Sequence, residues 1–260
     1  INNLARGFKH LLTWEPYVIR PENWDMNVIN QFDSFITFNR KFCESQNILS
    51  KSFITKCQSG GNIDYELNNF RKYEEKIKGI CILGKRGHDK RQEQGNIYFL
   101  REEFLKHLFV EPALVKHLYA HNPWGGRFYQ GRCEPYDPWG IAALRKINEY
   151  LFCFCPENTY HPLWSWGYLT TRLRRCFKAK TIGIYIGCYN IDELVPKDLY
   201  IDFRDFYGDY SRLAEYLINF PKEKYLEMTE RAYKWYKTCK LGLADDFENL
   251  LNSVVVNENN

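Results

Sequence analysis

Two segments, YLFCFCPEN (residues 150–158) and GYLTTRLRRCFKAKTIGIYIG (residues 167–187), decide the fold class of this chain. The apolar runs 150–155 and 182–186 have the length and composition of buried strands. Between them, apolar side chains recur at the spacing of one helix face: Leu169, Leu173, Cys176 and Phe177. A strand, a helix and a second strand in this order predict a parallel βαβ unit, and therefore an α/β protein.

The same alternation continues through most of the chain. Short apolar runs at 80–83 and 199–203 predict two further strands. The apolar stripes at 100–118 and 225–235 predict helices, the first broken or kinked by a proline and the second starting after one. Together these elements predict an open, mainly parallel sheet with helices packed on it.

The chain before residue 77 is more irregular, with one short apolar run at 35–38 that predicts a strand. We therefore expect an N-terminal domain at 1–77, a larger C-terminal domain at 78–256 and a frayed tail at 257–260. Ligands of open parallel sheets bind beyond the carboxyl ends of the strands, often between two domains.

The composition excludes several classes of protein. The chain has 260 residues, of which 45% are hydrophobic and 26% charged, so it is neither disordered nor a coiled coil. The net charge of +4 is too small for a nucleic-acid partner. We expect no membrane-spanning helix and no signal peptide, because no apolar stretch is long enough for the first and no charged-then-apolar start is present. Sequence signatures of glycine-rich dinucleotide loops, P-loops and nucleophile elbows are absent.

The cysteines indicate a reducing compartment. Nine of them form no short, even framework, and we interpret them as free, buried thiols. Cys153 and Cys155 lack a second pair at zinc-ligand spacing, and His117 and His121, on a predicted helix, lack an acidic third ligand. No Asn-x-Ser/Thr sequon occurs. We therefore expect a cytoplasmic protein without a metal site, or one of the Golgi lumen if an N-terminal anchor has been removed.

A basic segment follows the strand at 150–155. From residue 158 to 191 it contains no Asp or Glu but five basic side chains: Arg172, Arg174, Arg175, Lys178 and Lys180. If Thr170 caps the helix, Arg172 lies in the first turn, where a cation opposes the helix dipole unless an anion is bound. Free backbone N–H groups together with arginine favour a phosphate site. The alternative is a solvated basic helix face.

Gly187 ends the second strand of the βαβ unit. A glycine at the carboxyl end of a strand allows the backbone to approach a ligand closely. The alternative is an ordinary turn glycine.

Three runs resemble the donor-binding region of glycosyltransferase family 10, the α-1,3/1,4-fucosyltransferases: residues 157–158, 168–173 and 184–187. The family pattern is Phe-Glu-Asn, then Tyr-Val/Ile-Thr-Glu-Lys, then Pro-Val/Ile-Tyr-x-Gly. Runs that are weakly similar to the acceptor-domain pieces Glu-Ser-Pro, Asn-Trp-Thr and Ser-Asp-Ile-Phe stand at 15–16, 23–24 and 33–36. Together the matches extend from about Trp14 to Phe206.

The resemblance implies a GT-B-like fold, in which two Rossmann-like domains face a cleft and the C-terminal one binds the nucleotide sugar. It implies an inverting glycosyltransferase that needs neither a metal nor another cofactor. Such an enzyme moves a sugar from a nucleoside-diphosphate sugar to a hydroxyl of a glycan or glycoprotein acceptor.

The resemblance also implies roles for particular residues. Arg172 would contact the diphosphate, and Glu15 would be the general base that deprotonates the acceptor hydroxyl. The basic side chains would stabilise the charge that develops on the leaving diphosphate. The rest of the donor site would comprise Arg101, Glu157, Asn158, Tyr168, Thr171 and Gly187.

This chain departs from the family pattern at three positions. Thr171 replaces the glutamate that helps to hold the nucleotide ribose, Arg172 replaces a lysine, and Gly183 replaces a proline. The donor is therefore GDP-fucose or a UDP-sugar such as UDP-xylose. The alternative function is a catalytically inactive carbohydrate-binding or scaffolding protein with the same fold.

Each role also has a structural alternative. Glu15 would be a surface acid, Arg101 would pair with an adjacent glutamate, and Tyr168 would belong to the core. Four tryptophans in loops rich in glycine and proline would either stack on sugar rings or fill the loop packing: Trp124, Trp139, Trp164 and Trp166.

Overall fold

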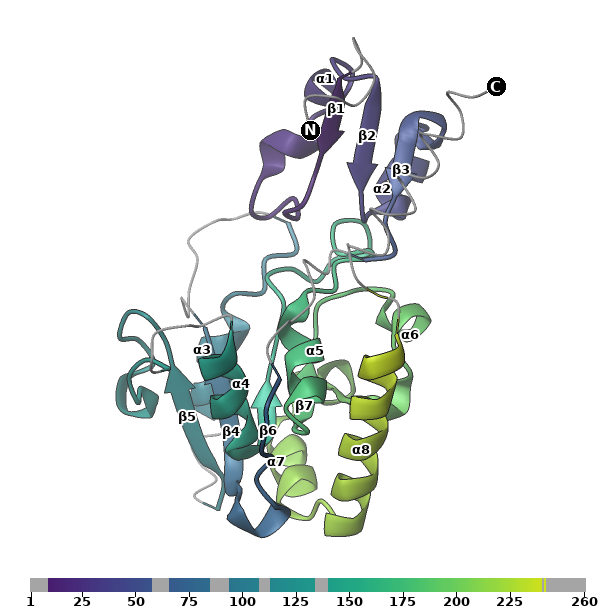
Figure 1. Cartoon of the computed structure of the whole chain (residues 1–260). Helices are drawn as coiled ribbons and strands as arrows, with labels where there is room; N and C mark the ends of the chain where they lie inside the picture. Colours follow the sequence, from purple (N-terminus) through teal and green to yellow (C-terminus); the bar gives the residue numbers. More distant parts are fainter. Residues whose placement is uncertain are drawn as a thin grey trace.

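The computed structural model describes residues 9–57, 66–84, 94–107, 113–133, 140–239 and 241. Figure 1 shows two units, a small N-terminal one and a larger one that contains the rest of the described chain. Each unit is built on its own parallel sheet. The predicted α/β fold class is therefore confirmed.

The small unit is a three-stranded sheet in the order β1-β2-β3. Its strands are β1 (His10–Leu12), β2 (Ser34–Thr37) and β3 (Ser52–Ile54), and its helices are α1 (Met26–Ile29) and α2 (Arg40–Ser45). Its core is aromatic, because the ring of Trp24 meets the edges of Phe35 and Phe42 at 6.0 and 5.0 Å. Such edge-to-face contacts add about 1 kcal/mol each to the burial of the rings.

The large unit is a five-stranded sheet in the order β5-β4-β6-β7-β8, with every neighbouring pair parallel. The strands are β4 (Ile77–Leu83), β5 (Val115–Tyr119), β6 (Tyr150–Phe154), β7 (Ile182–Tyr185) and β8 (Ile201–Asp202). Along the chain the sheet first grows from β4 to β5, and then in the opposite direction from β6 to β8. The direction reverses between β4 and β6, and in sheets of this kind ligands bind at that point, beyond the carboxyl ends of the strands.

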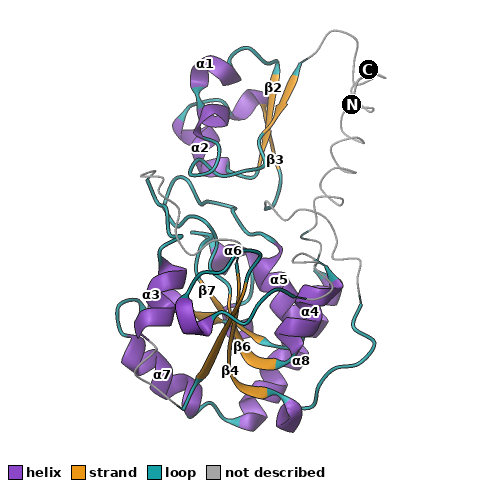
Figure 2. Ribbon diagram, turned by 90° about the vertical axis from the view of Figure 1, so that its left-hand side faces the viewer, coloured by secondary structure: helices purple, strands orange, loops and turns teal. Residues whose placement is uncertain are grey.

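Helices cover both faces of the large sheet (Figure 2). They are α3 (Leu100–His107), α4 (Ile141–Asn148), α5 (Thr171–Lys178), α6 (Ile191–Leu194), α7 (Tyr210–Ile218) and α8 (Lys222–Thr238). Because alternate residues of a strand face opposite ways, Phe152 and Phe154 pack with α3 and α7, whereas Cys153 and Cys155 pack with α4, α5 and α8. The apolar run that predicted β6 is thus buried on both faces.

One predicted element is wrong in part. The helix predicted at 100–118 ends at His107 as α3, and Val115–Tyr119 forms β5 at the edge of the sheet. Phe104 and Leu105 of the helical stripe are buried on α3, whereas residues 115–119 pair with β4 instead. His117 therefore lies on a strand, so His117 and His121 do not share a helix face.

Other expectations can be compared directly. The strand predicted at 199–203 is shorter, since only Ile201–Asp202 pairs with β7. Within the described residues the cysteines are free thiols, as predicted. No helix among these residues is long and apolar enough to span a membrane. The two sheets lie on either side of residue 77, but the division into independent domains stays a prediction; Trp139 and the tail at 257–260 lie outside the described residues.

A buried lysine precedes the large sheet. Lys76 is only 7% exposed, and its Nζ donates hydrogen bonds to the carbonyl oxygen of Lys180 and to Oγ1 of Thr181, both at 3.1 Å. Burial, with a smaller contribution from Arg71, lowers the pKa of Lys76 to about 7. Lys180 O keeps a second donor, the hydroxyl of Tyr225 at 3.0 Å.

We expect Lys76→Met to be more stable than the wild type at about pH 6, by about 3 °C or more in Tm. Below pH 7 the buried Lys76 is charged in the folded wild type, and the desolvation of this charge lowers the free energy of unfolding. From pH 7 to about 10, Lys76 is neutral in the folded state but still protonated in the unfolded state. The unfolded state therefore binds more protons, and the stability of the wild type rises with pH. The difference in Tm between Lys76→Met and the wild type should therefore be smaller at about pH 10. Thermal melts across this range test it, with exposed Lys106→Met as the control; a variant less stable at pH 6 would contradict it.

Candidate functional site

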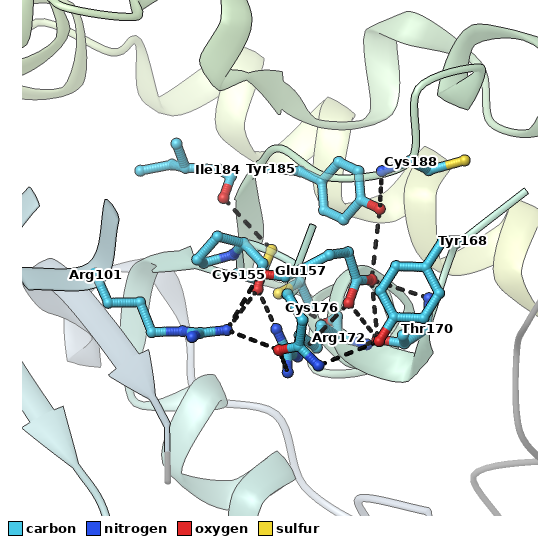
Figure 3. Close-up of polar contacts among 12 residues, drawn as sticks. Arg101, Cys155, Glu157, Tyr168, Thr170, Arg172, Cys176, Ile184, Tyr185 and Cys188 are labelled. Carbon is cyan, nitrogen blue, oxygen red and sulfur yellow. Dashed lines mark hydrogen bonds and ion pairs between the residues drawn. The ribbon is translucent and has the colours of Figure 1, made fainter. Parts of the chain in front are cut away.

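The candidate site lies at the carboxyl edge of the large sheet, where the strand order reverses. Residues 156–158 follow β6, and α3 belongs to the connection that follows β4. Figure 3 shows that side chains from α3, the start of α5 and the end of β7 converge on this segment. Strand order therefore brings together residues as distant in sequence as Arg101 and Tyr185.

Arg101, from α3, holds the segment after β6 in place. Its guanidinium donates to the carbonyl oxygens of Pro156 and Glu157 at 3.1 and 3.3 Å. The residue is only 3% exposed, so the predicted alternative of a solvated ion pair is wrong. Burial, and then the positive charge of Arg172, lowers the pKa of Arg101 to about 9.

Arg172 approaches the same segment from the first turn of α5. It donates to the carbonyl oxygen of Pro156 and to Oδ1 of Asn158, the latter at 2.8 Å, and its Nε lies 3.7 Å from a carboxylate oxygen of Glu157. Its side chain is 21% exposed, more than that of Arg101. Arg172 is thus the cation of the pair that solvent or a ligand reaches.

Glu157 is a fully buried carboxylate that joins α5 to the sheet. Its oxygens accept hydrogen bonds from the backbone N–H and hydroxyl of Thr170 at 2.8–2.9 Å, and from the hydroxyl of Tyr185 at 3.4 Å. Burial raises the pKa of Glu157, and the charge of Arg172 opposes that shift. These contacts fix the start of α5 against the end of β6.

The helix start has the predicted cap. Oγ1 of Thr170 accepts a hydrogen bond from the backbone N–H of Arg172 at 3.3 Å. Thr171 is the first helical residue and is half-buried. The candidate anion-binding end of α5 therefore lies beside Arg172.

Asn158 and Tyr168 connect the arginine pair to the small unit. Nδ2 of Asn158 donates to the hydroxyl of Tyr168 at 3.2 Å, and the ring of Tyr168 lies 5.6 Å from that of Phe38, just after β2. Nδ2 of Asn39 also donates to the carbonyl oxygen of Leu163 at 2.7 Å. Tyr168 is fully buried in the core of the small unit, so its position fits the structural alternative as well as a donor-site role.

Glu15 lies in the loop after β1 and is half-buried. Its carbonyl oxygen accepts a hydrogen bond from Nε1 of Trp24 at 3.1 Å. Its charge contributes, after burial and Glu157, to raising the pKa of Tyr168. The charge of Glu15 therefore acts on Tyr168, which is one of the predicted site residues.

Gly187, two residues beyond β7, packs directly against Glu157. A Cβ atom added at Gly187 would lie 2.3 Å from Cβ and Cγ of Glu157. The absence of a side chain at Gly187 thus allows the backbone after β7 to approach Glu157 after β6 closely, which an ordinary turn would not require.

The charge of this cluster is unbalanced. Arg172 is close enough to lower the pKa of Arg101, and the carboxylate of Glu157 pairs with Arg172 and feels the charge of both arginines. The described cluster of these three residues carries a net charge of +1 in a poorly solvated place. An anion that binds there would neutralise this net positive charge.

The rest of the basic segment has another role. Arg174, Arg175 and Lys178 are 7% exposed or less, so the predicted solvated basic face is wrong for these three. Arg174 donates to the carbonyl oxygen of Leu241 at 3.1 Å, and Lys178 lies 3.6 Å from Glu66. Arg174 and Lys178 thus hold residues distant in sequence, and Arg172 is the member of the segment that joins the site.

Sequence reasoning missed two parts of the site. The carbonyl oxygen of Pro156 accepts from both arginines, and the hydroxyl of Tyr185 bridges Glu157 and the backbone N–H of Cys188. A backbone acceptor carries no sequence signal, and Tyr185 lies within an apolar strand run. Among the described residues, no group of three or more His, Cys, Asp or Glu side chains is arranged to hold a metal ion; independence from metal stays a prediction.

Comparison with known proteins gives a likeness in structure. No protein-family model and no curated protein matches the chain. A solved α-glucosyltransferase in complex with UDP-glucose and DNA containing an abasic site has a TM-score of 0.60 at 9% identity, over 95% of this chain and 72% of that one. The same type of enzyme with UDP and a 13-mer DNA with a central A:G mismatch has a TM-score of 0.58 at 9% identity, over 98% and 73%.

A solved α-1,3-fucosyltransferase with GDP has a TM-score of 0.50 at 15% identity, over 85% of this chain and 64% of that one. Across the fucosyltransferase structures that it matches, the chain spans 38–67% of their length. At these identities the likeness shows the fold: the chain has the GT-B-like architecture of nucleotide-sugar-using glycosyltransferases. Membership of family 10 stays a prediction.

Proposed function

We propose that this chain is a glycosyltransferase that moves a sugar from a nucleoside-diphosphate sugar to a hydroxyl of a glycan acceptor. The observation that carries the proposal is the arginine pair: Arg172 pairs with the buried carboxylate of Glu157, and Arg101 binds the main-chain carbonyl oxygen of the same residue, where the strand order of the large sheet reverses. A diphosphate supplies the negative charge that this cluster lacks.

The roles follow from exposure. Arg172, the more exposed cation, contacts the diphosphate together with the first turn of α5. Arg101 donates its hydrogen bonds to backbone carbonyl oxygens, so it positions residues 156–158 and adds positive charge without contacting the diphosphate. Both stabilise the charge that develops on the departing diphosphate. GDP and UDP both remain candidate donor nucleotides, and each occurs in one of the similar structures.

Glu15 is the proposed general base. It lies in the loop after β1 of the small unit, and its charge contributes to raising the pKa of Tyr168, whose hydroxyl accepts a hydrogen bond from Asn158 of the site. A carboxylate there removes the proton of the acceptor hydroxyl while the leaving group departs on the other side, which gives inversion at the anomeric carbon. In the proposed mechanism no metal ion takes part, so the transfer assay is run with and without a chelator.

Isothermal titration with GDP and with UDP tests the donor site. We expect one of the two to bind, and Arg172→Met to weaken it about 10- to 100-fold, because a charge-assisted hydrogen bond contributes about 1.5–3 kcal/mol. Arg145→Met, which removes an exposed arginine of α4, is the matched control and should bind as the wild type does. Equal affinity in wild type and Arg172→Met would contradict the assignment.

The competing function is the catalytically inactive binding protein. Two observations favour it: Thr171 stands at the position of the family glutamate, and Arg172 already has three internal partners. Measuring transfer from GDP-fucose and from UDP-sugars separates the two functions. We expect transfer that Glu15→Gln reduces about 100-fold or more with nucleotide affinity unchanged. Nucleotide binding without transfer to any acceptor would favour the inactive protein.

A further inference from the structure

Three aromatic side chains form a strip on the loops that carry the site: Tyr160, Trp166 and Tyr189. Each lies two positions along the chain from a residue of the site, so the strip is carried by the same loops. The loops are joined to each other, since the backbone N–H of Tyr189 donates to the carbonyl oxygen of Ser165 at 3.2 Å. The strip therefore keeps a fixed position relative to the site.

The rings are nearly parallel but displaced. Tyr160 and Tyr189 have centroids 5.6 Å apart, Trp166 and Tyr189 6.1 Å apart, and both pairs an interplanar angle of 29°. The overlapped rings of Phe104 and Phe154, by comparison, are 3.8 Å apart. Displacement leaves ring faces partly uncovered, and Tyr189 is 37% exposed. The strip thus offers partly exposed aromatic faces to a ring-shaped ligand.

The strip also contacts the small unit. Nζ of Lys41, from α2 of the small unit, lies 5.8 Å from the ring centroid of Trp166. Trp166 of the strip therefore contacts the small unit, the unit that also carries Glu15.

The surrounding charges select the kind of ligand. Lys41 lies 3.9 Å from Glu44. Arg204, which donates to the carbonyl oxygen of Tyr189 at 3.4 Å, forms ion pairs with two carboxylates, those of Asp192 and Asp202. A nucleic acid needs cations that are available to its phosphates, and these two are neutralised by acids. The charges favour a neutral ring over a nucleotide chain.

We propose that the strip of Tyr160, Trp166 and Tyr189 binds a pyranose ring of a neutral acceptor glycan. The axial C–H groups of such a ring lie flat on the aromatic faces, while its hydroxyl groups reach water and the polar groups around the strip. The inference rests on the proposed glycosyltransferase function, because it assigns the acceptor side of that same site.

The test is an array of neutral glycans, probed with the labelled full chain in the presence of GDP or UDP. The Kd of the strongest glycan is then measured for the wild type, Tyr189→Ala and Trp166→Ala. We expect each variant to weaken this glycan about tenfold, as the loss of an aromatic contact predicts. Tyr216→Ala, which removes a tyrosine of the same 37% exposure on α7, is the matched control and should bind as the wild type does.

Nucleotide affinity separates this proposal from the one on which it rests. If GDP or UDP binds normally but no neutral glycan binds, or if Tyr189→Ala binds the glycan like the wild type, the strip is not an acceptor site while the donor site stands. If oligothymidylate binds and Tyr189→Ala abolishes that binding, the strip stacks bases, and the glycan assignment is wrong. Failure of both nucleotides to bind would contradict the glycosyltransferase function itself.

Discussion

Replacing Gly187 by alanine is expected to destabilise the fold by about 3 kcal/mol or more. The added Cβ would lie 2.3 Å from two side-chain carbons of Glu157, in a backbone conformation with φ of +156° that side chains rarely adopt. Glu157 has little freedom to move away, because Thr170 and Tyr185 hold its carboxylate. Denaturant unfolding measures the loss.

Gly208→Ala is the matched control for this variant. Gly208 also has a positive φ, of +82°, but a Cβ added there meets no atom within 4 Å. It should therefore lose only the cost of backbone strain, about 1 kcal/mol. Equal losses at the two positions would mean that contact with Glu157 is not what requires Gly187.

Glu157→Gln is expected to cost about 3–5 kcal/mol of folding stability, the usual effect of removing one partner from a buried charge cluster. It leaves Arg172 without its carboxylate partner and removes the negative charge near Arg101, and it places an amide N–H group beside the donors of Thr170. The loss should be seen in denaturant unfolding at neutral pH.

A double variant tests the cause of that loss. If charge imbalance is responsible, Glu157→Gln with Arg172→Met should be more stable than Glu157→Gln alone, by about 1 kcal/mol or more, because one uncompensated cation is gone. Additive losses in the two single variants would show that Glu157 acts through its hydrogen bonds with Thr170 rather than through charge.

The sequence was sufficient for the elements that are buried on both faces. The runs that form β6 and β7, and the helix between them, have unambiguous periods, and their order alone predicts a parallel unit. The helix start was also predictable, because a threonine cap is a local interaction. The edge strand β5 was not, since its stripe continues the helical spacing and its pairing with β4 is a long-range event.

The candidate site was only partly predictable. Resemblance brought Arg101 and Arg172 together as a pair, but not the burial of Arg101, which depends on backbone carbonyl oxygens after β6. The alternative of a solvated basic helix face is wrong for Arg174 and Lys178, because their charges are met by residues distant in sequence. The aromatic strip depends on the folding of three separate loops, and no spacing along the chain indicates it.

The central claim is that a nucleoside diphosphate binds beside Arg172 at the carboxyl edge of the large sheet. A crystal structure of the chain grown with GDP or UDP tests it most directly. The account predicts diphosphate oxygens within about 3 Å of the Arg172 guanidinium and of the first turn of α5. A nucleotide bound elsewhere, with Arg172 still holding Pro156, Glu157 and Asn158 as it does here, would contradict it.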